Sequence, residues 1–214
     1  MSLKLYFHPL SSFCQKVLVA LYESGTAFEP VMVDLGKPEE RGALLKLWPI
    51  GKFPVLRDEA KARTIPESTV IIEYLNRHYP GKARMVPQDS ELAAQVRAQD
   101  RFFDLYLQLP MQKIVGDRLR PPESRDPYGV EQAKVQLKTA YDIIERDLAD
   151  KRWAAGDMFT MADCAAAPAL FYADLVLASG GHKVVSAYRE RLLERPSYKR
   201  ALEEARPYFG LFPK

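Results

Sequence analysis

The feature of this sequence that most restricts its fold is a change of pattern near residue 80. Before that point, short runs rich in β-branched and aromatic residues alternate with runs of helical spacing, whereas only helical patterns follow residue 90. Alternating strands and helices in so short a segment indicate one small sheet covered by helices. The chain is therefore predicted to have an α/β domain over residues 1–80 and an all-helical domain over residues 90–214.

The first 80 residues give the element order βαβαββα. Tyr79-Pro80-Gly81 ends the last of these helices, and residues 81–89 have no periodicity, which predicts a linker. Strands are expected at 3–7, 28–33, 54–57 and 63–65, and helices from the turn at 11–14 up to Gly25, over 38–47 and over 68–79.

The second domain is predicted to be a helical bundle. A long helix over residues 90–118 contains Pro110, which should kink it. The nearly all-apolar segment 165–177 should be the central, buried helix of the bundle. Further helices are expected over 184–193, from Pro196 onward, and over 128–148, where Val135, Leu137, Ile143, Ile144 and Leu148 should face inward.

Composition excludes several classes of function. The 31 basic and 28 acidic residues leave a net charge of +3 without a basic block, so nucleic acid is not an expected partner. No apolar run is long enough to cross a membrane, and the chain enters its first strand without a signal peptide. Two cysteines and three histidines give neither a disulfide framework nor metal-ligand spacing, and we expect a cytoplasmic protein without a metal.

The turn at residues 11–14 is the first candidate site. Pro9 ends the strand 3–7, and a helix begins just after it, so Ser11, Ser12 and Cys14 lie at a strand-to-helix turn. A helix N-terminus presents free N–H groups that suit an anion such as a thiolate. The alternative is structural: Ser11 or Ser12 caps the helix, and Cys14 fills the core.

Two further segments carry polar chemistry near predicted element ends. Pro54 begins a strand, and its peptide bond is either cis, exposing the preceding backbone groups to a ligand, or an ordinary trans bond. Glu67 and Ser68 precede a helix, where the hydroxyl and the helix amides would bind a carboxylate and Glu67 an ammonium group. Such a pair of charges occurs in an α-amino acid. The alternative is that both residues only cap the helix.

Thr160 and Asp163 form a pattern of a different kind. Their spacing matches a capping box in which Asp replaces the usual Glu or Gln, at the start of the predicted central helix. Both residues are therefore interpreted as structural, and Cys164 as inert core.

At this point the chain resembles the cytosolic glutathione transferases, in particular bacterial-type members with a serine in the opening turn. The resemblance extends over essentially the whole length and implies a thioredoxin-like N-terminal domain that binds glutathione. It also implies that the helical domain supplies the pocket for a small hydrophobic electrophile. The motifs that carry it are Pro9-Leu10-Ser11-Ser12-Phe13-Cys14, Pro49-Ile50-Gly51-Lys52-Phe53-Pro54-Val55-Leu56, Glu67-Ser68-Thr69-Val70-Ile71-Ile72-Glu73-Tyr74-Leu75 and Phe159-Thr160-Met161-Ala162-Asp163-Cys164-Ala165.

The resemblance also implies roles for single residues. Ser11, with Ser12 as the fallback, donates a hydrogen bond to the glutathione sulfur. The backbone of Phe53, ahead of a cis Pro54, pairs with the cysteinyl part, and Lys52 lies by the glycyl end. The γ-glutamyl group is bound by two residues, Glu67 and Ser68.

Two departures from the family pattern concern the glycyl end of glutathione. Trp48 stands where the family usually has Asn, so that turn is expected to differ. Glu39 and Glu40 stand where many members place a basic residue, with Lys37 and Arg41 on either side. The contact to the glycyl carboxylate is therefore left unassigned.

The electrophile pocket is less defined. Phe103, Tyr106, Leu107 and Met111 on the long helix either face the sulfur or belong to the core. Nothing in the sequence names the electrophile.

The leading hypothesis is a glutathione transferase whose thiolate attacks a carbon electrophile or reduces a peroxide. The alternatives are a thiol–disulfide oxidoreductase using Cys14, a glutathione-dependent isomerase, and a binding protein without turnover. Cys14 occupies the second position of the turn, whereas redox members of this fold place the reactive cysteine at the first, here Ser11. The resemblance further implies a homodimer formed through the helices at 68–79 and 90–118.

Overall fold

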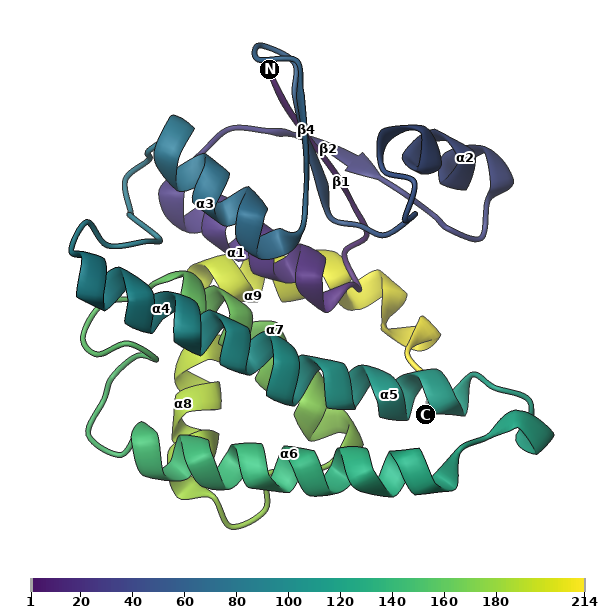
Figure 1. The fold of residues 1–214 in the computed structure, drawn as a ribbon, viewed down its shortest axis with the longest axis vertical. Helices are drawn as coiled ribbons and strands as arrows, with labels where there is room; N and C mark the ends of the chain where they lie inside the picture. The colour runs from purple at the N-terminus through teal and green to yellow at the C-terminus, as the bar shows by residue number, and fades with distance from the viewer. Residues whose placement is uncertain (1, 214) are drawn as a thin grey trace.

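The computed structural model describes residues 2–213, and its N-terminal part is a four-stranded mixed sheet (Figure 1). The strand order is β2-β1-β3-β4, with β1 parallel to β2 and antiparallel to β3, and β3 antiparallel to β4. The strands are β1 (Leu3–Phe7), β2 (Glu29–Met32), β3 (Val55–Asp58) and β4 (Arg63–Pro66).

Helices cover both faces of this sheet. On one face, α1 (Ser12–Ser24) and α3 (Ser68–His78) pack against the inward side chains of β1 in the main core. On the other, α2 (Pro38–Leu47) contributes Leu44 to a small second core with Val55. The predicted order βαβαββα is confirmed, because alternation and the Pro and Gly positions mark these short elements well.

The remainder of the described chain, residues 90–213, contains helices and no strand, as predicted. The apolar helix α7 lies in the middle of the bundle and packs against α1, α4 and α8, which confirms its predicted central position (Figure 1). The elements are α4 (Ser90–Phe102), the π-helical segment η1 (Phe103–Gln108), α5 (Leu109–Arg118), η2 (Pro122–Ser124), α6 (Pro127–Asp147), α7 (Met161–Val176), α8 (Lys183–Leu193), α9 (Pro196–Ala205) and η3 (Arg206–Leu211).

The long helix departs from expectation at Pro110. A π-helical segment, η1, separates α4 from α5, and Phe103 and Leu109 have helical dihedral angles. Figure 1 shows α4 and α5 following one another in one continuous run of helix. The Leu109 N–H donates to the carbonyl of Asp104, five residues back. Pro110 has no N–H and would clash with a carbonyl four residues back in an α-helix. A π turn directly before it accommodates both constraints.

The inward face of α6 was predicted only in part. Leu137, Ile144 and Leu148 are buried, but Val135 is 58% exposed and Ile143 is half-buried. The five residues predicted to face inward do not lie on one face of α6, since Val135 and the buried Leu137 lie on different sides of the helix.

The capping box at the start of α7 is confirmed. The Asp163 carboxylate accepts hydrogen bonds from the backbone N–H of Thr160 at 2.8 Å and of Ala154 at 2.8 Å. It also accepts from the Tyr188 hydroxyl at 2.6 Å. Asp163 is fully buried, so it ties the start of α7 to α8 and to the loop before α7.

Helix α1 connects the two parts of the molecule. Gln15, on its buried side, donates to the Tyr172 hydroxyl of α7 at 2.9 Å and to the carbonyl of Pro9 at 2.9 Å. Tyr172 in turn donates to the carbonyl of Leu10 at 2.8 Å. The turn before α1 is thereby fixed against the helical bundle.

Candidate active site

A cavity of about 680 Å³ lies where the first turn of α1, the start of β3 and the N-terminus of α3 meet the long helix. Its volume falls in the range typical of small-molecule sites. The N-terminal domain supplies Ser11, Phe13, Leu35, Trp48, Lys52, Phe53, Pro54, Glu67, Ser68, Thr69 and Val70, and the helical domain supplies Arg101, Asp104, Leu105, Leu109 and Gln112.

Ser11 and Ser12 have different environments. Ser11 is the N-cap of α1 and lines the cavity, and its Oγ accepts from the Cys14 N–H at 3.4 Å. That contact is long and uses only an acceptor lone pair, so the hydroxyl can still donate its proton. Ser12 is buried, and its Oγ accepts a hydrogen bond from Gln108 of η1. Only Ser11 of the pair faces the cavity.

The Cys14 thiol is fully buried under the first turn of α1. Burial raises its pKa to about 12. A nucleophilic cysteine needs an accessible thiolate. Cys14 therefore fits the core role considered from the sequence and not that of a redox nucleophile.

The peptide bond between Phe53 and Pro54 is cis, which resolves the choice left open by the sequence. Both residues line the cavity, as does the exposed side chain of Lys52. All three residues predicted in this segment thus border the same space as Ser11.

Glu67 has a backbone conformation that a helix cap does not need. Its φ of 70° lies in the left-handed region, and its side chain makes no capping hydrogen bond. A non-glycine residue in this region typically costs about 1–3 kcal/mol and often marks a functional site. The exposed Glu67 and the buried Ser68 both line the cavity. The capping alternative therefore does not account for Glu67.

The loop that precedes α2 is closed on itself. Glu40 accepts from the backbone N–H of Asp34 at 2.6 Å and from Lys37 Nζ at 2.9 Å. Lys37 is thereby paired within the loop, while Trp48 at the end of α2 lines the cavity. Of the cavity-lining residues in the N-terminal domain, Lys52 alone is cationic.

The helical wall of the cavity was not identified from the sequence. Leu105, Leu109 and Gln112 line it. The residues considered from the sequence do not: Phe103, Leu107 and Met111 are core residues, and Tyr106 is exposed outside the cavity lining. The π turn changes the phase of the helix at this point, and a pattern based on 3.6 residues per turn cannot locate the face beyond it.

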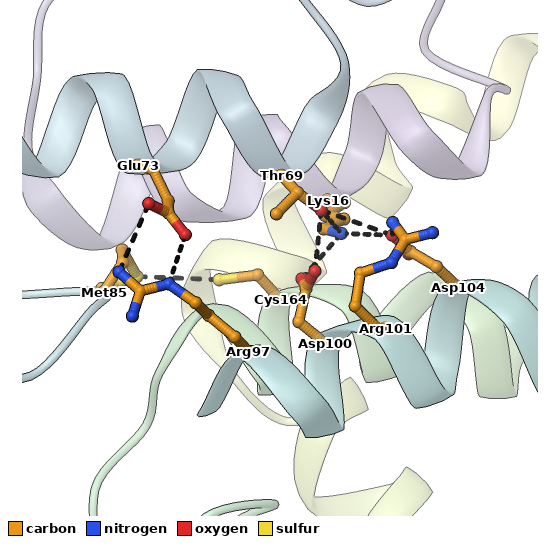
Figure 2. Close-up of polar contacts among 9 residues, drawn as sticks. All are labelled: Lys16, Thr69, Glu73, Met85, Arg97, Asp100, Arg101, Asp104 and Cys164. Carbon is orange, nitrogen blue, oxygen red and sulfur yellow. Dashed lines mark hydrogen bonds and ion pairs between the residues drawn. The ribbon is translucent and has the colours of Figure 1, made fainter. Parts of the chain in front are cut away.

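Beside the cavity lies a buried ion cluster that the sequence reasoning also missed (Figure 2). Lys16, only 1% exposed, places Nζ 2.7 Å from Asp100 Oδ1 and 2.8 Å from Asp104 Oδ2. It also donates to Thr69 Oγ1 at 2.8 Å. Arg101 Nη1 contacts the same Asp104 Oδ2 at 3.2 Å. The cluster therefore joins α1, α3 and the long helix.

Burial raises the pKa of Asp104, whereas the charge of Lys16 opposes this effect. Two signals in the sequence point to the cluster in retrospect. Lys16 directly precedes the apolar run 17–21, and the polar residues Asp100, Asp104 and Gln108 recur at intervals of four. The first pattern places a cation beside an apolar helix segment, and the second places the three polar residues on one helix face.

Residues 5–83 match the family model described as "Glutathione S-transferase, N-terminal domain", and residues 127–207 match that of "Glutathione S-transferase, C-terminal domain". A glutathione S-transferase of Silene vulgaris is 29% identical, with 94% of this chain and 97% of the relative covered.

The chain is also similar to a relative that is not named a transferase and to a crystal structure with a bound ligand. A stringent starvation protein A homolog of Haemophilus influenzae is 26% identical over 91% of this chain and 87% of its own length. The crystal structure of a glutathione S-transferase from Methylobacillus flagellatus KT, with GSH bound, superposes with a TM-score of 0.86 at 25% identity, covering 94% of this chain and 98% of that one.

None of the helices that the structure describes is long and apolar enough to span a membrane.

Proposed function

The chain belongs to the glutathione S-transferase family of enzymes, and we propose that it activates the glutathione thiolate through Ser11 for attack on a hydrophobic electrophile. The observation that carries the proposal is the convergence of all the predicted glutathione-binding residues on one cavity. These residues are Ser11, Lys52, Phe53, Pro54, Glu67 and Ser68.

Thiol activation follows from the position of Ser11. A free thiol with a pKa near 8.5 is only a few per cent ionised at pH 7. Lowering that pKa by about two units requires ~2.7 kcal/mol of preferential stabilisation of the thiolate. One charge-assisted hydrogen bond contributes about 1.5–3 kcal/mol and the N-terminus of α1 about 0.3–1 kcal/mol. Ser11 and the α1 dipole together can therefore supply most of this stabilisation.

The charged groups at the cavity orient the remaining parts of glutathione. Glu67 binds the ammonium of the γ-glutamyl group, and Ser68 with the free amides of α3 binds its carboxylate. Lys52, which lines the same cavity as Phe53, is the proposed neighbour of the glycyl end. Together these contacts hold the sulfur at Ser11, in the cavity that Leu105 and Leu109 of the long helix also line.

Leu105 and Leu109, with Phe13 and Leu35 of the N-terminal domain, give this cavity apolar side chains for the electrophile. Gln112 adds an amide to the same lining. A conjugation reaction in this space proceeds by attack of the thiolate on a carbon atom. Peroxide reduction would use the same thiolate to attack a peroxide oxygen and release an alcohol, after which a second glutathione forms the disulfide and water. Isomerisation would use it to add to a carbon atom and then leave again, so that glutathione is regenerated.

The test is the pH dependence of glutathione conjugation to a generic aryl halide. Ser11→Ala should lose most of the activity and raise the apparent thiol pKa by about 1–2 units, the equivalent of one charge-assisted hydrogen bond. Ser12→Ala and Cys14→Ala are matched controls from the same turn, and both should keep the parental pKa. An unchanged pKa in Ser11→Ala, or loss of activity only in Cys14→Ala, would contradict the assignment.

A binding protein without turnover is the second candidate. It is favoured by the similarity to a relative that is named a stringent starvation protein A homolog and not a transferase. Glutathione binding measured by calorimetry, without conjugation of any aryl halide or reduction of any peroxide, would support this alternative.

We further propose that the protein is a cytoplasmic homodimer. Tyr106 on η1 is an exposed aromatic side chain outside the cavity lining, on one of the two helical segments predicted to pair. Sedimentation equilibrium should give twice the chain mass, and a concentration-independent monomer would contradict the dimer.

A further inference from the structure

Arg101 is the one arginine that lines the cavity. Its side chain is 52% exposed, and Nη1 makes a contact of 3.2 Å with Asp104 Oδ2. A guanidinium carries five N–H donors in a planar fork that matches a carboxylate. A single partner leaves most of these donors available to an anion in the cavity.

Buried partners determine where this guanidinium lies. Asp104 Oδ2, which accepts from Arg101, also accepts from Lys16 Nζ at 2.8 Å and lies 3.4 Å from Thr69 Oγ1 (Figure 2). Thr69 directly follows Ser68 at the N-terminus of α3. Because one oxygen contacts both Arg101 and Thr69, the guanidinium lies next to the predicted γ-glutamyl subsite.

We propose that Arg101 binds the α-carboxylate of the γ-glutamyl group from the helical domain, opposite Ser68. This assignment rests on the proposed function, because it takes glutathione as the ligand. The γ-glutamyl group carries one positive and one negative charge, and the subsite then presents Glu67 to the ammonium and Arg101 to the carboxylate. Lys16 is a positioning residue in this arrangement, since it fixes Asp104 and through it the guanidinium.

Arg97, one turn earlier on α4, provides a matched control. It is also exposed, but it pairs with Glu73 of α3 through Nε at 2.6 Å and Nη2 at 3.3 Å and does not line the cavity. Figure 2 shows the two arginines reaching different acidic partners. Removing Arg97 therefore changes the same helix and the same net charge without affecting the subsite.

The experiment compares three S-methylated ligands by calorimetric titration. The first is S-methylglutathione, the second replaces the γ-glutamyl group with 4-aminobutanoyl and so lacks the α-carboxylate, and the third replaces it with glutaryl and so lacks the ammonium. Arg101→Gln should weaken binding of the first and third by about tenfold, the lower end for a charge-assisted hydrogen bond at a half-exposed site. Binding of the aminobutanoyl ligand should change by less than twofold. Arg97→Gln should bind all three like the unaltered protein.

Two results would overturn the assignment alone: full retention of S-methylglutathione binding in Arg101→Gln, or an equal loss for S-methylglutathione and the aminobutanoyl ligand. The second result would give Arg101 a structural role only. If the unaltered protein binds neither glutathione nor its S-methyl form, the proposed function fails and this assignment fails with it. An unfolding midpoint of Arg101→Gln close to that of Arg97→Gln shows that the comparison concerns binding.

Discussion

Replacing Lys16 with Met removes the only buried cation of the ion cluster and retains much of the side-chain volume. The change leaves Asp100 fully buried and the Asp104 side chain 7% exposed, without the ammonium that lies 2.7 Å and 2.8 Å from them. Breaking a buried ion pair from one side typically costs about 3–5 kcal/mol, because a desolvated charge is left behind. We expect a loss in this range, which is a large part of the ~5–15 kcal/mol by which domains are stable.

The pH dependence distinguishes lost charge pairing from lost packing. Burial already raises the pKa of Asp104 and Lys16 opposes it, so removing Lys16 raises that pKa further. A buried carboxyl group whose pKa is raised in the folded state does not lower the stability of the protein while it is protonated. It lowers the free energy of unfolding as the pH rises through the folded pKa and the group ionises. The stability deficit of Lys16→Met should therefore be smaller at pH 5 than at pH 8.

The assay is urea unfolding followed by circular dichroism at both pH values. Lys113→Met serves as the control, since Lys113 pairs with Asp126 at the surface, where side chains are 34% and 39% exposed, and should lose at most about 1 kcal/mol. If Lys16→Met does not fold, the combined variant with Asp100→Asn and Asp104→Asn should recover folded protein. A deficit that is the same at pH 5 and pH 8, or no larger than that of Lys113→Met, would refute the reasoning.

Two other predictions concern the helical domain. Asp163→Asn should lower the free energy of unfolding by about 2–4 kcal/mol, because its amide group would face backbone and hydroxyl donors that now donate to a buried carboxylate. Thermal unfolding measures this loss, and a loss below 1 kcal/mol would contradict the prediction. The hydrogen bond to Asp142 raises the pKa of His182, so the stability from this contact is complete below the unfolded pKa near 6.5 and disappears as the pH rises through the folded pKa. His182→Gln should accordingly destabilise the protein more at pH 6 than at pH 9 in urea unfolding, and an equal effect at both would exclude the linkage.

The parts of the fold that the sequence predicted are those set by local chemistry. Alternation marked the strands, Pro and Gly marked their ends, and the Thr160–Asp163 spacing marked the cap of α7. Six cavity residues of the N-terminal domain, Ser11, Lys52, Phe53, Pro54, Glu67 and Ser68, lie in short motifs and could be predicted from them, whereas Leu35 lies in no such motif and was missed. The conformation of the bond before Pro54 could not, because both isomers are compatible with the local sequence.

The helical wall depends instead on contacts between distant segments. The π turn before Pro110 changes which side chains of the long helix face inward, and so Leu105 and Leu109 were missed. Lys16 has a defined environment only because two carboxylates 84 and 88 residues away, Asp100 and Asp104, come to it in the fold. A single sequence does not show that pairing.

Two side-chain contacts connect α1 to the long helix, and we call them the polar seam: Ser12 with Gln108 and Lys16 with Asp104. This seam gives a physical reason for burying charge in the interface. Ser12 and Lys16 are four residues apart on α1, and their partners Gln108 and Asp104 are four residues apart on the long helix. An apolar seam would bury a similar area in several registers, but a slip of one turn would leave Lys16 or its partner carboxylate buried without an opposite charge. We infer that the seam selects one register. Because Ser11 precedes the seam on α1 and Arg101 lies at its other end, that register also sets the distance between the proposed thiolate and γ-glutamyl contacts.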